Sequence, residues 1–172
     1  MAINDEILAG FDDVKLQNIA SQLGLQPDQV KGVLNDSLGA ILGGINNNVQ
    51  SPDGAASLAN ALGAHAGANP LGDIGGLLSG VLGGGILDKV LGANTPEVSQ
   101  ALGNKQGVSG VDVEKILKIA APLVMAFLAK RMAGGGKADP GAVQKEVQQV
   151  NSQAQQGLPD LGSILGGLLG RK

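Results

Sequence analysis

The chain has 172 residues, of which 29 are glycine, two are aromatic and none is cysteine, and its formal net charge is −3 at pH 7. The lack of cysteine excludes disulfide bonds, thiol catalysis and cysteine-ligated metals. Because aromatic side chains usually supply much of a core's buried area, aliphatic residues and alanine must build a shallow core here. The first 13 residues have no basic segment followed by an apolar run, so we expect no secretory signal and a cytoplasmic protein.

The sequence repeats itself. At an offset of 83 positions, the residues of the first half that are identical to their counterparts in the second include Ile3, Asp5, Leu8, Gly24, Val30 and Leu34. At an offset of 87, residues 71–83 match residues 158–170, and four extra residues fit best at the glycines of 134–136. We therefore predict two tandem copies, residues 1–85 and 86–172, which form one compact, pseudo-symmetric domain.

Residues 20–33 have the spacing of a helix-turn-helix. Ala20 is expected on the first helix, Gly24 in the turn, and Val30 and Val33 on the buried side of the second helix. Copy two has four residues in the equivalent places: Gly103, Gly107, Val113 and Ile116. Such a unit either reads DNA through its second helix or serves as a compact way to pack two helices.

The charges favour the packing interpretation, because DNA binding needs a basic surface. The second helix of copy one carries Asp28 and Asp36 against Lys31 alone. In copy two, Lys115 and Lys118 are accompanied by two acidic residues, Asp112 and Glu114. DNA binding therefore stays an alternative, and nucleic acid is not an expected partner.

Capping patterns predict further helices. Four prolines follow a residue that can cap a helix N-terminus, where proline's missing N–H costs nothing: Ser51-Pro52, Asn69-Pro70, Thr95-Pro96 and Asp139-Pro140. Ser109 and Asp112 resemble a capping box. Strand patterns are missing, so the predicted fold class is all-α, a compact bundle of short helices. Pro122 aligns with Gly39, and we expect a kink or a helix junction at both positions.

Glycines recur at a spacing of four, which on a helix forms a flat stripe for close approach of another helix. These stripes are candidate self-association surfaces or faces for another protein: Gly39, Gly43, Gly76, Gly80, Gly84, Gly162, Gly166 and Gly170.

Copy one has two basic and eight acidic residues, a net charge of −6, whereas copy two has ten basic and seven acidic residues, a net charge of +3. Such halves attract each other within one molecule or between molecules, and head-to-tail contact gives a ring or a filament. The candidate electrostatic contacts are Asp5, Glu6, Asp12, Asp13, Lys115, Lys118, Lys130 and Arg131.

Catalytic motifs are missing, and we predict no enzyme, no catalytic residue, no cofactor and no metal site. The longest uncharged apolar stretch, residues 74–87, has 14 residues. That is short of the roughly 18–20 residues that a spanning helix needs, so no transmembrane segment is expected. Peripheral membrane association through residues 74–87 and 161–169 is a second alternative.

Three segments resemble the bacterial YidB-like domain-of-unknown-function family: residues 19–30, 48–58 and 116–125. The most specific parts are Gln-Ser-Pro-Asp-Gly-Ala at 50–55 and Ala-Pro-Leu-Val-Met at 121–125. The resemblance covers about residues 15–132 and implies a bacterial helical protein. The family has no established activity, so it implies no functional residues. The leading hypothesis is a non-enzymatic protein that associates with itself or scaffolds partners.

Overall fold

The computed structural model describes residues 3–65, 72, 76, 81–133 and 139–156. The helices are α1 (Ile3–Leu8), α2 (Asp13–Leu23), α3 (Pro27–Asn48), α4 (Pro52–His65), α6 (Val81–Val90), η2 (Gly92–Asn94), α7 (Thr95–Gln106), α8 (Gly110–Ala133) and α9 (Pro140–Gln156). No strand occurs in this part of the chain. The predicted all-α fold class is confirmed.

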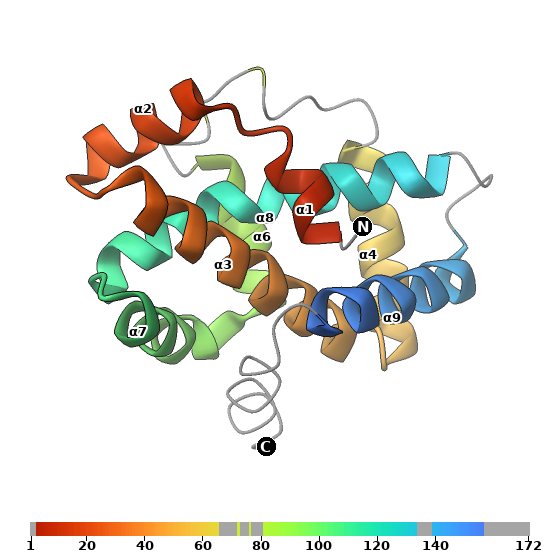
Figure 1. Cartoon of the computed structure of the whole chain (residues 1–172). Coiled ribbons are helices and arrows are strands. Elements are labelled where there is room, and N and C mark those ends of the chain that lie inside the picture. The colour runs from red at the N-terminus through yellow and green to blue at the C-terminus, as the bar shows by residue number, and fades with distance from the viewer. Residues whose placement is uncertain (1–2, 66–71, 73–75, 77–80, 134–138, 157–172) are drawn as a thin grey trace.

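Helices α3 and α8 form the centre of the molecule and pack against each other. Figure 1 shows them crossing, with α2 and α7 towards one end and α4 and α9 towards the other. Helix α9 packs on α3, while α4 packs on both α8 and α9. Each half of the sequence therefore contributes a helix that covers the central helix of the other half.

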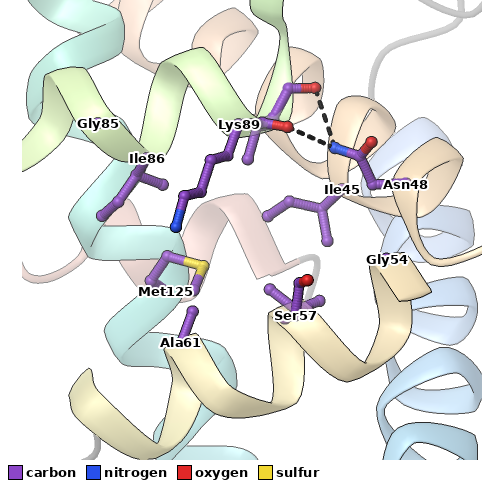
Figure 2. A pocket seen from close by; sticks show the side chains of 11 residues that line it. Ile45, Asn48, Gly54, Ser57, Ala61, Gly85, Ile86, Lys89 and Met125 are labelled. Atoms are coloured by element: carbon purple, nitrogen blue, oxygen red, sulfur yellow. Dashed lines mark hydrogen bonds between the residues drawn. The ribbon is translucent and has the colours of Figure 1, made fainter. Parts of the chain in front are cut away.

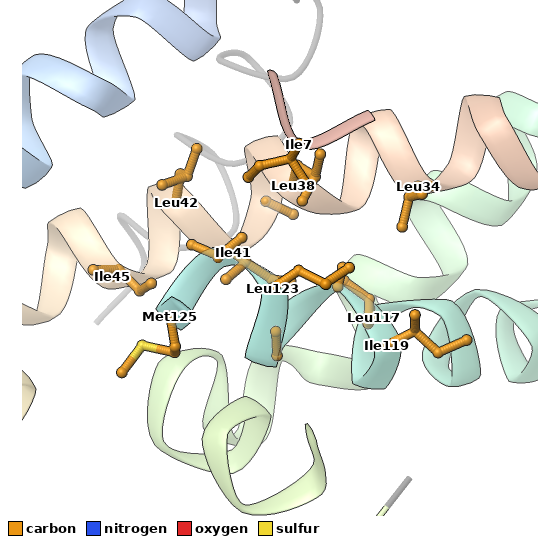
Figure 3. Packing of buried hydrophobic residues seen from close by; sticks show 14 of the residues in the cluster. Ile7, Leu34, Leu38, Ile41, Leu42, Ile45, Leu117, Ile119, Leu123 and Met125 are labelled. Atoms are coloured by element: carbon orange, nitrogen blue, oxygen red, sulfur yellow. The ribbon is translucent and has the colours of Figure 1, made fainter. Parts of the chain in front are cut away.

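The core is a single cluster of buried hydrophobic side chains that draws on both halves of the sequence. Leu34 and Ile41 of α3 and Leu117 of α8 are each at most 1% exposed, and Figure 3 shows these two rows of side chains between the crossing helices. Ile7 of α1 is also buried in this cluster. Nearly all of the side chains in this cluster are leucine, isoleucine, valine or alanine, as the composition predicts.

Both predicted helix-turn-helix units are present. Gly24 is the C-cap of α2 and Gly107 is the C-cap of α7, and both glycines have a left-handed backbone, with φ of 68° and 67°. A left-handed φ is unfavourable for residues with a Cβ, which explains glycine at this place. The turn is closed by backbone hydrogen bonds from Leu25 to Ala20 and from Val108 to Gly103, each 2.9 Å long.

The residues predicted to face inward in these units are buried. Val30 and Val33 of α3 are fully buried, and so are Val113 and Ile116 of α8 to within 1%. The turn residues and the buried side of each second helix are thus where the spacing places them.

The helix boundaries recur along the chain. Helix α3 begins at Pro27 and α8 at Gly110, an offset of 83 (110 − 27). Helix α4 begins at Pro52 and α9 at Pro140, an offset of 88 (140 − 52), within one residue of the offset of 87 in the C-terminal blocks. A symmetry relation between the two sets of helices stays a prediction. The predicted boundary between residues 85 and 86 lies inside α6, and the glycines at 134–136 lie outside the described residues.

Two of the predicted caps are confirmed. The Ser51 hydroxyl accepts from the Gly54 N–H at 3.1 Å, and the Asp139 carboxylate accepts from the N–H groups of Gly141 and Ala142 at 3.1 and 3.3 Å. The Asn69 cap lies outside the described residues. The Thr95 cap is wrong, because Thr95 is itself the first residue of α7 and its hydroxyl donates to the Gly92 carbonyl.

The Ser109 motif forms half of a capping box. The Asp112 N–H donates to the Ser109 hydroxyl at 3.2 Å, and that hydroxyl donates to the Asp112 carboxylate at 2.8 Å. A helix junction at Gly39 and Pro122 is wrong, because α3 and α8 each continue through these positions. An internal proline is compatible with a helix that tertiary packing holds, and Pro122 is buried.

Candidate functional site

A pocket of about 510 Å³ lies where the C-terminal end of α3, the helix α4 and the helix α6 meet over α8. It is shown in Figure 2 and is lined by Ile45, Asn48, Gly54, Ser57, Leu58, Ala61, Gly85, Ile86, Lys89, Val90 and Met125. The lining comes from both halves of the sequence, so we call it the junction pocket. The pocket's position depends on the close contacts that α3 makes with α4 and α6.

The turn between α3 and α4 sets one wall of the junction pocket. The Ser51 hydroxyl donates to the Asn48 carbonyl at 3.1 Å while it accepts from the Gly54 N–H. Gly54 lies so close to the Asn48 carbonyl that a Cβ at this position would collide with it. The glycine therefore allows α4 to begin directly against the end of α3.

The opposite wall is α6, which is held to α3 by a polar clamp. The Asn48 side-chain amide donates to the carbonyls of Lys89 and Val90, at 2.9 and 3.3 Å. Four residues earlier, a Cβ at Gly44 would lie 2.9 Å from the Val90 carbonyl, so only glycine permits this approach. These contacts fix the position of the α6 wall relative to the end of α3, where the opposite wall begins.

The chemistry of the junction pocket is apolar with one cationic group. Its polar lining residues are Asn48, Ser57 and Lys89, and the described lining contains no carboxylate, histidine or cysteine. Lys89 is exposed, and no ion pair of its ammonium group occurs in the part of the chain that the structure describes. Its side chain extends from α6 towards the side of the pocket where Ala61 and Met125 lie (Figure 2).

A second polar feature joins the halves inside the molecule. Asp36 of α3 is only 2% exposed. Its carboxylate accepts from the Lys105 ammonium at 3.2 Å and from the Gln106 amide at 2.6 Å, both at the end of α7. A buried carboxylate is expensive unless it is paired and hydrogen-bonded, and here it is both. From the sequence pattern, Asp36 is only one of the charges of a second helix, and this link to α7 cannot be predicted.

The four predicted acidic contacts are all exposed, at α1 and at the start of α2: Asp5, Glu6, Asp12 and Asp13. Asp12 caps α2 by accepting from the Lys15 N–H at 2.8 Å and also pairs with the Lys15 ammonium at 3.3 Å. The hydrogen bond from that backbone N–H, followed by the contacts with the ammonium, lowers the pKa of the Asp12 carboxyl below its usual 3.8. We call these four residues the acidic end.

Three of the four predicted cations are paired within their own half. Lys115 contacts Asp112 at 3.4 Å, Lys118 contacts Glu114 at 2.9 Å, and Arg131 contacts Glu146 at 2.6 Å. The Arg131 guanidinium also lies 5.8 Å from the ring centre of Phe127, within the range of a cation–π contact. Lys130 is exposed, and no ion pair of it occurs among the described residues.

The candidate glycines fall into three groups. Gly39 is buried within the fold, and Gly43, Gly76 and Gly84 are partly buried. A Cβ at Gly84 would have no neighbouring atom within 4 Å. Gly80, Gly162, Gly166 and Gly170 lie outside the described residues.

None of the described helices combines the length and the apolar character needed to cross a lipid bilayer. The described residues also contain no cluster of three histidine, cysteine or acidic side chains placed to hold a metal ion.

The model of the family described as bacterial protein of unknown function (DUF937) matches residues 5–131 of the chain. Comparison with curated proteins and with solved structures found no match. The matched range contains both helix-turn-helix units and all three segments that carry the resemblance to the YidB-like family, with which it is consistent. The chain therefore belongs to the DUF937 family of bacterial proteins of unknown function.

Proposed function

We propose that this protein is a non-enzymatic helical protein whose copies associate head to tail through oppositely charged surfaces. The observation that carries the proposal is the acidic end. All four of its carboxylates are exposed, and within the described residues only Asp12 has an ion-pair partner. Exposed charges of one sign that have no ion-pair partner, such as those of Asp5, Glu6 and Asp13, attract a surface of the opposite sign and steer its approach.

The basic counterpart is supplied by the second half. Its described residues carry seven basic and six acidic side chains, a net charge of +1. The remaining +2 of its +3 comes from Lys137, Arg171 and Lys172, less Asp160. Because most described cations are paired already, we assign the contact with the acidic end of the next molecule to Lys130 and to these three basic residues.

The glycine faces support the same proposal only in part. Gly39 is buried inside its own molecule, so we leave it out of the contact. Gly84 has open space around its missing side chain and offers a flat place on α6 for another helix or for a different protein partner. The proposal of a non-enzymatic role rests on the polar groups of the junction pocket, which do not form the acid and base pair of general acid–base catalysis.

The test is multi-angle light scattering of the full chain at low and at high salt, with negative-stain microscopy. Salt at about 1 M shortens the screening length to about 3 Å, so we expect association at low salt and its loss at high salt. A strict monomer at high protein concentration and low salt would contradict the proposal.

Two variants with equal charge change locate the contact. Asp5→Lys with Glu6→Lys reverses two charges of the acidic end, and we expect it to abolish association. Asp53→Lys with Glu97→Lys is the matched control, because these acids are also exposed and also lie in the first turn of a helix. Adding Arg171→Glu and Lys172→Glu to the first variant is expected to restore association. Equal loss in the control would show a net-charge effect instead.

A further inference from the structure

We propose that the junction pocket binds a free single-chain amphiphile with one anionic head group, such as a fatty acid. In this arrangement the alkyl chain lies against the apolar lining and the carboxylate meets the Lys89 ammonium. The site is separate from the acidic end, so the inference does not depend on self-association.

The size and lining of the junction pocket suit an alkyl chain. Its volume of about 510 Å³ lies within the range of about 300–1,000 Å³ that small-molecule pockets have. Side chains of Ile45, Leu58, Ile86 and Met125 line it from four different helices. Removing an alkyl chain from water contributes favourable free energy in proportion to the apolar area that is buried.

Lys89 selects the charge of the ligand. It is the one charged residue of the described lining, and its ammonium has no ion-pair partner there. The amide nitrogen of Asn48 already donates to two backbone carbonyls, which leaves the Lys89 ammonium and the Ser57 hydroxyl as donors for a ligand. Both are labelled around the pocket in Figure 2. An anionic head group next to apolar atoms is the chemistry that this arrangement recognises.

The α6 wall of the pocket is open because of a glycine. A Cβ placed on Gly85 would meet no atom within 4 Å, although Gly85 lines the pocket. We therefore expect a larger side chain at this position to occupy space that a ligand would use. Gly84, one residue earlier, is equally open but does not line the pocket. The two glycines thus provide a matched pair of substitutions.

The experiment is isothermal titration calorimetry of the full chain with dodecanoate below its micelle concentration, and with dodecanol as the uncharged analogue. We expect saturable binding of dodecanoate at one site per chain. Dodecanol is expected to bind about tenfold more weakly, because it cannot form the charge-assisted hydrogen bond to Lys89. Absence of saturable dodecanoate binding would overturn the proposal.

Variants separate the two parts of the site. Lys89→Gln is expected to weaken dodecanoate about tenfold and to leave dodecanol within about twofold, whereas Lys89→Arg keeps dodecanoate binding. Gly85→Leu is expected to weaken both ligands more than tenfold, while Gly84→Leu leaves both unchanged. Unchanged dodecanoate binding in Lys89→Gln, or equal effects of the two leucine substitutions, would contradict the assignment.

Two further arms identify the source of the ligand and separate this proposal from self-association. Co-sedimentation with phosphatidylglycerol vesicles, in the absence of any dodecanoate binding, would show that the protein binds a membrane surface and would overturn the free-ligand proposal. The titration is repeated in Asp5→Lys with Glu6→Lys, in which we expect unchanged dodecanoate affinity. Loss of binding in that variant would place the site at the contact between copies and contradict the junction pocket.

Discussion

The two helix-turn-helix units, α2–α3 and α7–α8, share one local geometry and differ where they meet. Both turn at a left-handed glycine with nearly the same φ. At the same register of the second helix, however, the first unit buries Asp36 and the second buries Ile119. Asp36 is paired with Lys105 and Gln106 of the other unit, whereas Ile119 joins the hydrophobic core. The turn within each unit is therefore repeated, whereas the contact that Asp36 makes with the other unit has no counterpart at Ile119.

A second difference lies beneath the turn. Ala20 in the first unit corresponds to Gly103 in the second, at the offset of 83. A Cβ at Gly103 would lie 2.5 Å from the Val108 carbonyl, whereas Ala20 carries a Cβ at the same place and is buried. The second turn is therefore the tighter of the two. The same helix-turn-helix motif thus allows two different distances between the end of the first helix and the turn that follows it.

The largest expected effect tests whether the two units contribute equally to one core. Leu34 and Leu117 occupy equivalent positions and are both fully buried. Leu34→Ala and Leu117→Ala should each lower the free energy of unfolding by about 2–5 kcal/mol, because each loses buried area and leaves a cavity. Urea unfolding followed by circular dichroism measures both. A cost below about 1 kcal/mol at one position only would show unequal units.

The buried carboxylate tests the asymmetry between the units. Asp36→Ala should lower the free energy of unfolding by about 2–3 kcal/mol, because Lys105 and Gln106 lose a buried partner. Asp36→Leu makes this position resemble Ile119 and should be less destabilising than Asp36→Ala, since its apolar side chain fills the volume although Lys105 and Gln106 still lose their partner. If Asp36→Leu is as destabilising as Asp36→Ala, the carboxylate itself is required.

The tightness of the two turns predicts a smaller effect. Gly103→Ala should destabilise by about 1–2 kcal/mol even though alanine favours helices, because the new methyl group meets a backbone carbonyl that cannot rotate away. Ala20→Gly should cost about 1 kcal/mol from helix propensity alone. Thermal unfolding of both variants provides the comparison, and a stabilising Gly103→Ala would show that the turns are equally open.

The smallest effect concerns Asp12 and Thr95, which occupy equivalent positions at the start of the two units. Asp12 caps α2 and its pKa is lowered, chiefly by the backbone hydrogen bond from Lys15, so its contribution is present above the usual value of 3.8 and is lost as pH falls through the folded-state pKa. The destabilisation caused by Asp12→Asn should therefore shrink towards zero in acid. Its counterpart Thr95 is uncharged, and the cost of Thr95→Ala should not vary with pH. Urea unfolding at pH 7 and near pH 2 measures both.

Local features of the fold could be predicted from the sequence because they depend on neighbours along the chain. Gly24 marks the first turn, and Val30 marks the buried face of the helix that follows it. Ser51 and Asp139 mark the starts of two helices, because each side chain accepts a hydrogen bond from the N–H group three residues further along the chain. Thr95 was misassigned because its hydroxyl has a backbone carbonyl within reach on the N-terminal side. The residue types do not show whether the Thr95 hydroxyl bonds to this carbonyl or to an N–H group of the following turn.

The candidate site could not be predicted, because it depends on residues that are distant in the sequence. The Asn48 amide reaches carbonyls 41 and 42 residues away, and Asp36 reaches partners 69 and 70 residues away. No periodicity encodes such pairs. The junction pocket depends on the close approach of α3 and α6 at Gly44 and on the open space beside Gly85. The sequence alone does not distinguish the roles of these two glycines. Their different roles follow from the tertiary arrangement.

Native-state hydrogen exchange tests most directly whether the two units share one core. Residues 34–41 of α3 and 117–124 of α8 contribute side chains to the same buried cluster, so the backbone amides of these two segments should open with one free energy and one dependence on denaturant. That free energy should equal the global free energy of unfolding, and Asp36→Ala should lower it equally in both helices. Exchange of one helix at a distinctly lower free energy than the other would contradict a shared core and show two units that unfold separately.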